Sequence, residues 1–410
     1  MALTGHAEGA PLQASRDYLG VLHAWGERLA AASAAFGQRV QADALLLTER
    51  AALLGLHRQA QISAGGQSRL MRAADGWVAV TLAREDDVRS VQAWLGCAPP
   101  DNTWDAVTDV VRTRRVRDLV LQGRLLGLPV AQLPWAVICK ARRRSEPRAQ
   151  AAGRFPVRVV RGEGAGTPGL RTADGRRRIP MVLDFSSLWA GPLCGHLLGR
   201  SGARVIKVES TRRLDGARST PALFDLLHHG QEMLALDFQD TRDLAALRRL
   251  VAQADMVIEA SRPRAFAQLG LAASDCMRSN PRLTWVGITA YGREGERANW
   301  VGFGDDVAAA AGLVECDSAG APCFVGDAIA DPLTGIAAAI AAMESHVDGG
   351  GVLLDVAMAR VASAFAHAPP LCRSGPAATA TPPAAPRTRP TSGKAHASGA
   401  HTAALLREFA

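Results

Sequence analysis

The chain has 410 residues, 48% apolar and 21% charged, an ordinary composition for a soluble globular protein, and its length predicts two or three domains. The N-terminal residues lack the basic start and apolar core of a secretory signal, and no uninterrupted apolar stretch reaches membrane-spanning length, so we expect a cytoplasmic protein without a membrane partner. The net charge of +8 is confined to 140–178, which contain twelve basic and three acidic residues. This stretch has too few aromatic side chains to favour nucleic-acid binding.

The seven cysteines are widely scattered along the chain and include no C-x-x-C pair. That spacing argues against a disulfide framework and against a structural zinc site, so we expect no bound metal. The odd number suits a reducing compartment, in which we expect most of the thiols to be reduced and buried.

Residues 1–139 are predicted to form a helical segment followed by a small α+β region. The stretch 18–36 repeats its apolar residues with a helical period. Asp75-Gly76 then precedes the alternating stretch 77–80, which predicts a turn followed by a strand. Two amphipathic segments follow at 88–95 and 104–121, and the stretch 125–133 ends this region.

The basic stretch 140–178 is rich in Gly, Pro and Arg and is predicted to be an exposed linker. Its charge would also attract polyanionic ligands such as phosphate-bearing cofactors. If such binding were its role, deletion of the stretch would abolish ligand affinity.

Residues 179–366 alternate strand-like and helix-like segments. Strands are expected at 179–186, 203–210, 232–239, 255–261 and 283–292, and helices at 191–202, 241–254 and 264–270. This alternation predicts βαβ units with helices on both faces of the sheet. The predicted fold class is therefore α/β, with a doubly wound, mostly parallel, Rossmann-like sheet plus a smaller α+β domain.

Residues 367–410 are predicted to be a Pro/Ala-rich tail that is extended or loosely held. Its last residues, 399–410, predict a short terminal helix. The expected domains are thus 1–139, 140–178, 179–366 and 367–410.

The turn after the first strand of the predicted sheet lacks the glycines of a dinucleotide site. A dinucleotide-binding Rossmann sheet would carry the motif G-x-G-x-x-G in this turn, but here only Gly191 occupies it, followed by Pro192. Glu209 ends the second strand where a ribose-binding acid would lie, but it carries little weight without those glycines. The sequence also lacks a P-loop and a G-x-S-x-G elbow, which argues against the usual NTPase and α/β-hydrolase chemistry.

Six segments follow one another in 179–366: VLDFSSLWAGPLCGHLLGRSGARVIKVES, LALDFQD, MVIEASRPRAFAQLGL, NPRLTWVGITAYGREG, VGDAIADPLTGIAAAIAAM and GGGVLLDVAMARV. They resemble, in the same order, motifs of the class III CoA-transferase (CaiB/BaiF) family. Residues 69–133 are similar to the small domain of that family, which normally follows the sheet rather than preceding it. The chain therefore resembles a rearranged member of the family.

The resemblance implies transfer of coenzyme A between an acyl-CoA thioester and a free carboxylic acid, with CoA as a substrate rather than a permanent cofactor, in a homodimer. It places the catalytic nucleophile at Asp331. A carboxylate suits this role because it can form both an anhydride and a thioester and, with an ordinary pKa of about 4, is ionised at neutral pH. Asp331 before Pro332 also predicts a helix N-cap, which would hold the carboxylate at the mouth of a helix.

The same resemblance implies which residues contact CoA. They are Trp189, Ala190, Gly191, Leu236, Ser261, Arg262 and Tyr291. Each of four residues also has an alternative role without CoA. Ala190 and Leu236 could simply pack in the core, and Tyr291 could be a core aromatic. Arg262 could be a solvated surface charge.

Three positions depart from the family pattern near the expected nucleotide phosphates. Gln239 replaces a frequent Lys, Ala260-Ser261 replaces Asn-Phe, and Gln268 lies where formyl-CoA transferase has Arg. Fewer cations imply weaker CoA binding, or compensation by Arg262, Arg264 or the basic linker.

Two other functions stay open. The family includes α-methylacyl-CoA racemases, whose catalytic histidine would fall on Phe303, and none of the ten histidines lies between 230 and 345. The reordered domains and altered phosphate contacts would also fit a catalytically degenerate, CoA-binding partner subunit. The ADPLTG segment around Asp331 argues against that second alternative.

Overall fold

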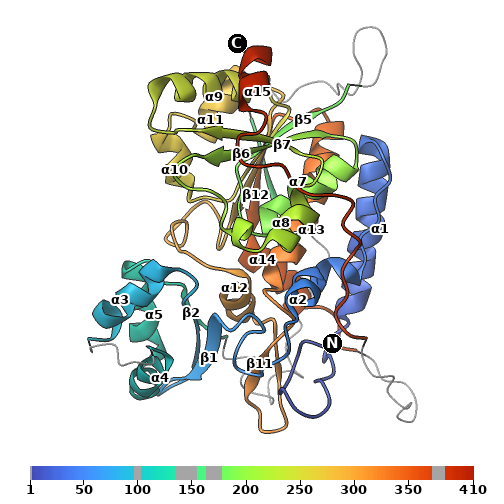
Figure 1. The fold of residues 1–410 in the computed structure, drawn as a ribbon. Helices are drawn as coiled ribbons and strands as arrows, with labels where there is room; N and C mark the ends of the chain where they lie inside the picture. The colour runs from blue at the N-terminus through green and yellow to red at the C-terminus, as the bar shows by residue number, and fades with distance from the viewer. Residues whose placement is uncertain (1, 97–102, 135–154, 163–177, 372–383) are drawn as a thin grey trace.

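The computed structural model describes residues 2–96, 103–134, 155–162, 178–371 and 384–410. The described residues form two structural units. The large unit is a seven-stranded sheet with its helices, and the small unit is a three-stranded sheet with three helices (Figure 1). Among the described residues, no helix has both the length and the apolar character needed to cross a bilayer.

The large sheet confirms the predicted doubly wound fold class. Its strand order is β4-β12-β9-β8-β5-β6-β7, and every pairing is parallel except that of β4 with β12. The strands are β4 (Arg158–Arg161), β5 (Met181–Asp184), β6 (Arg204–Ser210), β7 (Glu232–Leu236), β8 (Met256–Glu259), β9 (Thr284–Thr289) and β12 (Val352–Ala357). Numbered along the chain from β5, the six parallel strands have the Rossmann order 3-2-1-4-5-6.

Helices cover both faces of this sheet. The first face packs against α1 (Tyr18–Phe36), α7 (Ala190–Arg200), α8 (Pro221–His228), α13 (Ala330–Val347) and α14 (Met358–Ala366). The second packs against α9 (Thr241–Gln253), α10 (Pro263–Gln268), α11 (Ala273–Ser279) and α15 (Thr402–Glu408). The central helix α13 is rich in alanine, which lets α7 and α1 pack closely against it.

The N-terminal helix α1 spans the predicted residues but belongs to the large unit. Its apolar stripe, including Leu22, Trp25 and Leu29, enters the same core cluster as α13. Residues 1–139 are therefore not one structural region, because their first third packs on the large sheet. Periodicity identifies a helix and its apolar face, but it does not say which partner covers that face.

The small unit comprises β1 (Ser68–Arg72), β2 (Trp77–Thr81), β3 (Val130–Gln132), α3 (Glu85–Leu95), α4 (Thr103–Thr113) and α5 (Val116–Leu125). Its strands pair antiparallel in the order β1-β2-β3. The amphipathic stretch expected at 104–121 is two helices, α4 and α5, separated by Arg114 and Arg115. Helix α12 (Gly304–Ala310) lies between the small unit and α14 (Figure 1), and it contacts β2, β3, α13 and α14.

Described parts of the predicted linker and tail belong to the fold. Residues 158–161 form the edge strand β4, so the prediction of a plain linker is wrong there; most of 140–178 lies outside the described residues. In the tail, 384–398 form no helix or strand, but Arg389 makes a two-pronged ion pair with the buried Glu49 of α2 (Glu49–Leu54). Helix α15 lies where a terminal helix was predicted.

Candidate active site

Strands β5 and β8 lie side by side at the centre of the large sheet, and the chain leaves their carboxyl ends through 185–189 and 260–262. In doubly wound sheets, ligands bind at this topological switch point, because the two connections diverge toward opposite faces. Five of the seven expected CoA contacts, at 189–191, 261 and 262, fall on or next to these two loops.

The turn before α7 is held in a strained conformation. Leu188 has a φ of 70°, a left-handed value that non-glycine residues rarely adopt. Asp215 accepts hydrogen bonds from the N–H groups of Leu188 and Ala217, both at 2.9 Å. A Cβ on Gly191 would overlap the side chain of Ser186, so only glycine fits there. Strain of this kind persists only where neighbouring groups fix it, and it is common at functional sites.

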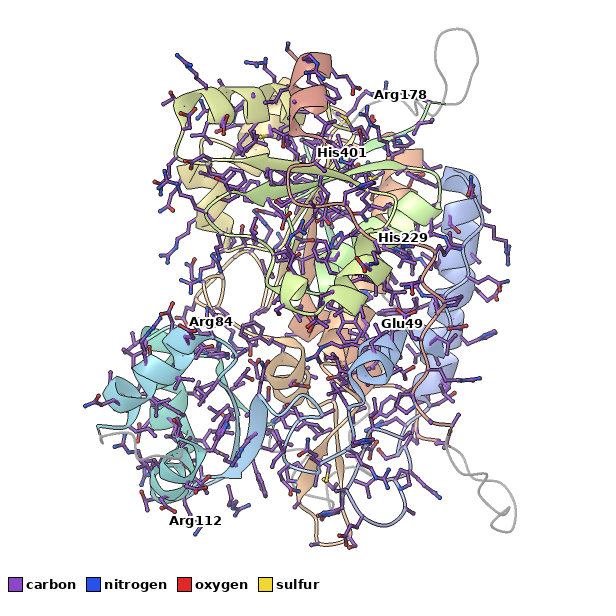
Figure 2. All side chains as sticks on the ribbon, in the orientation of Figure 1. Glu49, Arg84, Arg112, Arg178, His229 and His401 are labelled. Atoms are coloured by element: carbon purple, nitrogen blue, oxygen red, sulfur yellow. The ribbon has the colours of Figure 1, made fainter. Side chains whose placement is uncertain are left out.

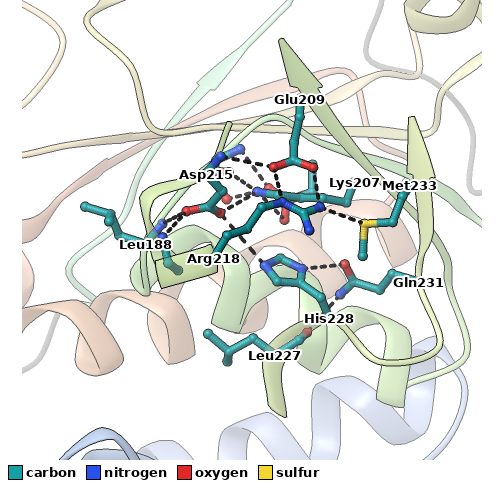
Figure 3. Close-up of polar contacts among 12 residues, drawn as sticks. Leu188, Lys207, Glu209, Asp215, Arg218, Leu227, His228, Gln231 and Met233 are labelled. Atoms are coloured by element: carbon teal, nitrogen blue, oxygen red, sulfur yellow. Dashed lines mark hydrogen bonds and ion pairs between the residues drawn. The ribbon is translucent and has the colours of Figure 1, made fainter. Parts of the chain in front are cut away.

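A buried charged network anchors this turn (Figure 3). Lys207 of β6 is fully buried, donates to the carbonyl of Ser186, and lies 3.0 Å from Asp215 and 4.0 Å from Asp184. A buried ammonium is tolerated only with such partners, so the network ties the loop after β5 to the loop after β6.

The second half of the network lies beside the first (Figure 3). Arg218 forms a two-pronged ion pair with Glu209, at 2.8 and 2.5 Å. Burial lowers the pKa of His228 to about 4, so this imidazole is neutral at pH 7, with Nδ1 2.8 Å from the Gln231 amide oxygen. These residues support the loops and are not placed to meet Asp331.

Asp331 is the second residue of α13, so its expected role as the N-cap is wrong. The helix begins at Ala330, and the N-cap position is taken by Ile329, which makes no side-chain cap. The Asp331 residue is half-buried, and within the part of the chain that the structure describes nothing donates a hydrogen bond to its carboxylate. The carboxylate is therefore held at the start of an 18-residue helix without being used to cap it.

A sharp turn positions Asp331. Ala328 has a φ of 42°, its N–H donates to Asp305 at 2.9 Å, and its carbonyl accepts from the N–H of Asp331 at 2.9 Å. Gly304, the first residue of α12, lies against the same turn, and a Cβ there would overlap both the Ala328 carbonyl and the Asp331 carboxylate. Helix α12 thus fixes the turn from which Asp331 projects.

Three further carboxylates surround Asp331. Asp305 and Asp306 belong to α12, and Asp327 precedes α13; Asp306 and Asp327 are completely buried. Burial first, and then repulsion among these groups, raises the pKa of Asp331 and of Asp306 to about 7 and that of Asp327 to about 6, and it also raises that of Asp305. The cluster therefore exchanges protons near neutral pH.

The small unit reaches this cluster directly. Ser68 of β1 donates to Asp305 at 3.2 Å, and Thr81 of β2 donates to Asp306 at 3.4 Å. Asp306 also accepts from the N–H of Phe303 at 2.7 Å, while its second oxygen lacks a partner among the described residues.

We expect Asp306→Asn to stabilise the fold, and to do so more strongly at pH 8 than at pH 5. The folded-state pKa of Asp306, about 7, exceeds its ordinary value of 3.8, so folding favours the protonated form and ionisation costs stability as the pH rises from 4 to 8. The amide should therefore gain about 1 kcal/mol or more at pH 8, since each unit of pKa shift corresponds to about 1.4 kcal/mol. Urea unfolding of both proteins at both pH values measures the difference, and an equal effect at pH 5 and pH 8 would contradict it.

The structure brings most of the sequence-predicted CoA contacts to one side of the sheet. Trp189 and Ala190 are buried at the start of α7, where the Ala190 carbonyl lies close to Gly335, one turn along α13 from Asp331. Because their side chains are covered, these residues would meet a ligand through the backbone. Ser261 donates to Glu259 at 3.5 Å at the end of β8.

Two of the predicted residues lie apart from that turn. Leu236 is 1% exposed at the end of β7, two strands away from β5. Tyr291 follows β9, is half-buried, and accepts a hydrogen bond from Arg124 of α5 at 2.9 Å. Burial and the nearby Asp306 raise the pKa of Tyr291, so its hydroxyl stays protonated.

Arginines gather where the small unit meets the switch point. Arg262 and Arg84 both lie against Gly127, and Arg84 donates to its carbonyl at 3.2 Å. Figure 2 shows Arg84 on the side of the small unit that faces the large sheet. Burial, followed by the charges of Arg264, Arg84 and Arg213, lowers the pKa of Arg262. This arginine cluster (Arg84, Arg213, Arg262 and Arg264) is a concentration of positive charge suited to phosphates.

Sequence reasoning missed most of this constellation. Asp305, Asp306, Asp327, Arg84 and Arg213 were not singled out from the sequence. A signal existed for Asp327, since it lies four residues before Asp331 in one motif. None existed for Arg84, because a residue of the small unit meets the sheet only in the folded chain.

One group of possible metal ligands lies away from this site. Ligand atoms of His6, Asp317 and Cys323 lie within 4.8 Å of one another. Burial, together with nearby acids, raises the pKa of Cys323 to about 12, so its thiol stays protonated and is a poor ligand. The 3.0 Å contact between His6 and Asp317 is explained as a link between the N-terminal segment and β10 (Val314–Cys316) with β11 (Pro322–Phe324).

Comparison with known proteins agrees with the motifs. The family model "CoA-transferase family III" matches residues 180–404. The succinate–glutarate CoA-transferase of Agrobacterium fabrum is 31% identical over 206 residues, which are 45% of this chain and 51% of that protein. A probable CoA-transferase of Mycobacterium tuberculosis is 27% identical over 301 residues, 58% of this chain and 37% of that protein. The human α-methylacyl-CoA racemase is 31% identical over 134 residues, 32% of this chain and 33% of that protein.

The chain therefore spans between about a third and a half of the length of these curated relatives. The family model, in contrast, covers more than half of the 410 residues and takes in the whole parallel sheet, the switch-point loops and Asp331. The resemblance inferred from the six motifs is confirmed, and the chain belongs to CoA-transferase family III.

Proposed function

We propose that this protein transfers coenzyme A between an acyl-CoA thioester and a free carboxylic acid, with Asp331 as the nucleophile. The observation that carries the proposal is the state of the Asp331 carboxylate. It is half-buried at the first turn of α13, and no described residue donates a hydrogen bond to it. It also lies one helical turn before Gly335, which is close to the Ala190 carbonyl at the switch point. An acid left unbonded in such a place is available for covalent chemistry.

The proposed reaction has balanced steps. A carboxylate oxygen of Asp331 attacks the thioester carbonyl, the carbon–sulfur bond breaks, and CoA leaves as a thiolate, which gives an acyl–aspartyl anhydride. The thiolate then attacks the Asp331 carbonyl and releases the acyl group as a carboxylate, leaving an aspartyl-CoA thioester. An acceptor carboxylate repeats the two steps in reverse order, so the products are a new acyl-CoA and the regenerated Asp331.

The surroundings of Asp331 support these steps. Its pKa of about 7 leaves much of the residue ionised at neutral pH, and as a stronger base than an ordinary aspartate it is also a better nucleophile. The start of α13 provides the positive end of a helix dipole near the oxyanions that form during attack.

CoA itself is proposed to lie along the switch point. The backbone at 189–191, which follows the strained residue Leu188, would contribute contacts to CoA. Ser261 and Tyr291 would add polar contacts, and Leu236 an apolar contact at the outer strand. Arg262, within the arginine cluster, would meet the nucleotide phosphates, and this cluster compensates for the missing cations at 239 and 268. The homodimer and the cytoplasmic location stay predictions.

We expect Arg262→Ala and Arg264→Ala each to weaken CoA binding about tenfold, because a charge-assisted contact to phosphate is worth about 1.5–3 kcal/mol. Calorimetric titration with free CoA measures the effect. Arg112→Ala is the matched control, since Arg112 is an exposed arginine at the far end of the small unit (Figure 2). Unchanged affinity in both variants would remove the arginine cluster from the CoA site.

The racemase alternative has less support at this site. The charged groups that influence Asp331 are Arg50, Asp305, Asp306 and Asp327, and no histidine is among them. Phe303, where the racemase histidine would fall, has no acid or base in its side chain, and its backbone N–H donates to Asp306. Proton abstraction beside a thioester would therefore lack its usual base.

One experiment tests the proposal against both alternatives. The protein is incubated in D₂O with a panel of acyl-CoA donors and ¹³C-labelled carboxylates, and the products are followed by mass spectrometry. Transfer gives acyl-CoA that carries the labelled acid, whereas racemisation gives deuterium beside the thioester without any transfer. Saturable CoA binding with neither product would identify a degenerate, CoA-binding subunit and overturn the proposal.

A further inference from the structure

The acidic cluster around Asp331 brings together more negative charge than a half-buried site can hold without a counter-ion. Asp305, Asp306, Asp327 and Asp331 come from two short stretches of chain, and one oxygen each of Asp306 and Asp327 has no hydrogen-bond partner among the described residues. Four carboxylates gathered in one largely buried cluster cannot all ionise unless a cation lies close by.

Arg50 of α2 supplies a cation at this position. Its Nη1 lies 2.5 Å from Oδ1 of the buried Asp327. The other side of the guanidinium rests against Gly65, where a Cβ would come within 3.0 Å of Nη2. Arg50 is therefore confined between a glycine and a carboxylate, and it is only 22% exposed.

The helix that carries Arg50 is itself anchored. Glu49, next to Arg50 in the chain, is completely buried and forms the two-pronged ion pair with Arg389 (Figure 2 labels Glu49). The Thr48 hydroxyl donates to the carbonyl of Arg387 in the same tail and accepts from its N–H. Both contacts hold the start of α2 against the tail, and the Arg50 guanidinium itself is held by Asp327 and Gly65.

The other cations, both beside the cluster and along the helices that pack on α13, have partners of their own. Arg124 of α5 acts on Asp306 and bonds Tyr291. Along α13, Arg28 of α1 pairs with Glu344 at 2.7 Å, and on α14 Arg360 pairs with Asp355 at 3.2 Å. Arg50 is thus the cation whose charge bears on Asp305, Asp327 and Asp331 together.

We propose that Arg50 is a positioning residue of the active site, which holds Asp327 and keeps the Asp331 carboxylate ionised for attack. This inference rests on the proposed function. It also gives the N-terminal segment, which lies outside the matched region 180–404, a part in the chemistry. Without Arg50, the Asp331 anion would face three neighbouring acids without the cation that acts on it among the described residues, so Asp331 would keep its proton up to a higher pH.

The test measures the protonation of Asp331 directly. Protein labelled with [4-¹³C]aspartate is titrated by NMR, and the Asp331 signal is assigned by its absence from Asp331→Asn. We expect Arg50→Ala to raise the titration midpoint by about one pH unit or more, and Arg50→Lys to restore at least half of that shift. An unchanged midpoint in folded Arg50→Ala overturns the inference, and Arg50→Gln takes its place if the alanine variant does not fold.

Arg28→Ala is the matched control. It also removes an ion pair between the N-terminal segment and α13, but Glu344 lies thirteen residues beyond Asp331, about 20 Å along the helix. We expect its Asp331 midpoint to match that of the unmodified protein. A shift as large as that of Arg50→Ala would mean that general loosening of α13, and not the Arg50 charge, moves the proton.

This readout separates the inference from the proposed function. The NMR midpoint does not depend on turnover, so a shift in Arg50→Ala without any CoA transfer by the unmodified protein would retain the electrostatic role and reject the function. CoA transfer by the unmodified protein, without a shift of the midpoint in Arg50→Ala, would retain the function and reject the electrostatic role of Arg50. If both hold, the acid limb of the transfer rate should move to higher pH in Arg50→Ala by the same amount as the midpoint.

Discussion

Asp331→Asn is expected to lower the rate of CoA transfer by a factor of about 10³ or more, because removal of a nucleophile leaves only substrate binding and oxyanion stabilisation to act. The amide is nearly isosteric with the acid, and it removes one negative charge from a crowded cluster, so the variant should be at least as stable as the unmodified protein at pH 8. The measurement is the initial transfer rate with the best donor and acceptor found in the panel.

Two comparisons make this result specific. Calorimetry should give the same CoA affinity for Asp331→Asn, which separates chemistry from binding. Asp348→Asn is the control for a lost carboxylate, since Asp348 is exposed at the opposite end of the same helix. Turnover that persists in Asp331→Asn would mean that another group is acylated.

Gly304→Ala is expected to reduce transfer about a hundredfold. The added Cβ would overlap the Ala328 carbonyl and the Asp331 carboxylate, so the turn that aims Asp331 must shift. Misplacement of a reacting group by about 1 Å can cost this much, even though no functional group is lost. The transfer rate and the free energy of unfolding should be measured together.

The matched control is Gly393→Ala. A Cβ there would meet nothing within 4 Å and Gly393 is exposed, so this variant carries the same chemical change without a clash. We expect it to keep full activity. A Gly304→Ala protein that keeps both its activity and its stability would show that the turn tolerates movement, which would contradict the tight positioning of Asp331.

The parallel sheet could be predicted because its signals are local. Strand β6 carries the β-branched residues Val205, Ile206 and Val208 within 204–210, and α9 over 241–253 has both a capping aspartate and a helical period, so each was placed within a residue or two. Helix α1 was placed at the same residues for the same reason. In each case the pattern that forms the element lies within the element.

Other features depend on contacts between distant segments. Arg114 and Arg115, which separate α4 from α5, carry no glycine or proline signal, and β4 is a strand only because β12 offers it an edge. Arg50 meets Asp327 across most of the chain, so no spacing rule connects them. The nucleophile was identified from its motif, but the charges that tune it could be found only in the folded structure.

The contact between Glu49 and Arg389 joins residues 340 positions apart, and it has a consequence for how the protein is made. Such long-range closures form late, because the entropy of the intervening chain must be lost first. During synthesis, helix α2 lacks this anchor until residue 389 has left the ribosome, although the parallel sheet is by then complete. Nascent chains would therefore hold Asp331 in its turn before they hold Arg50 in place, and the cluster would acquire its counter-ion last.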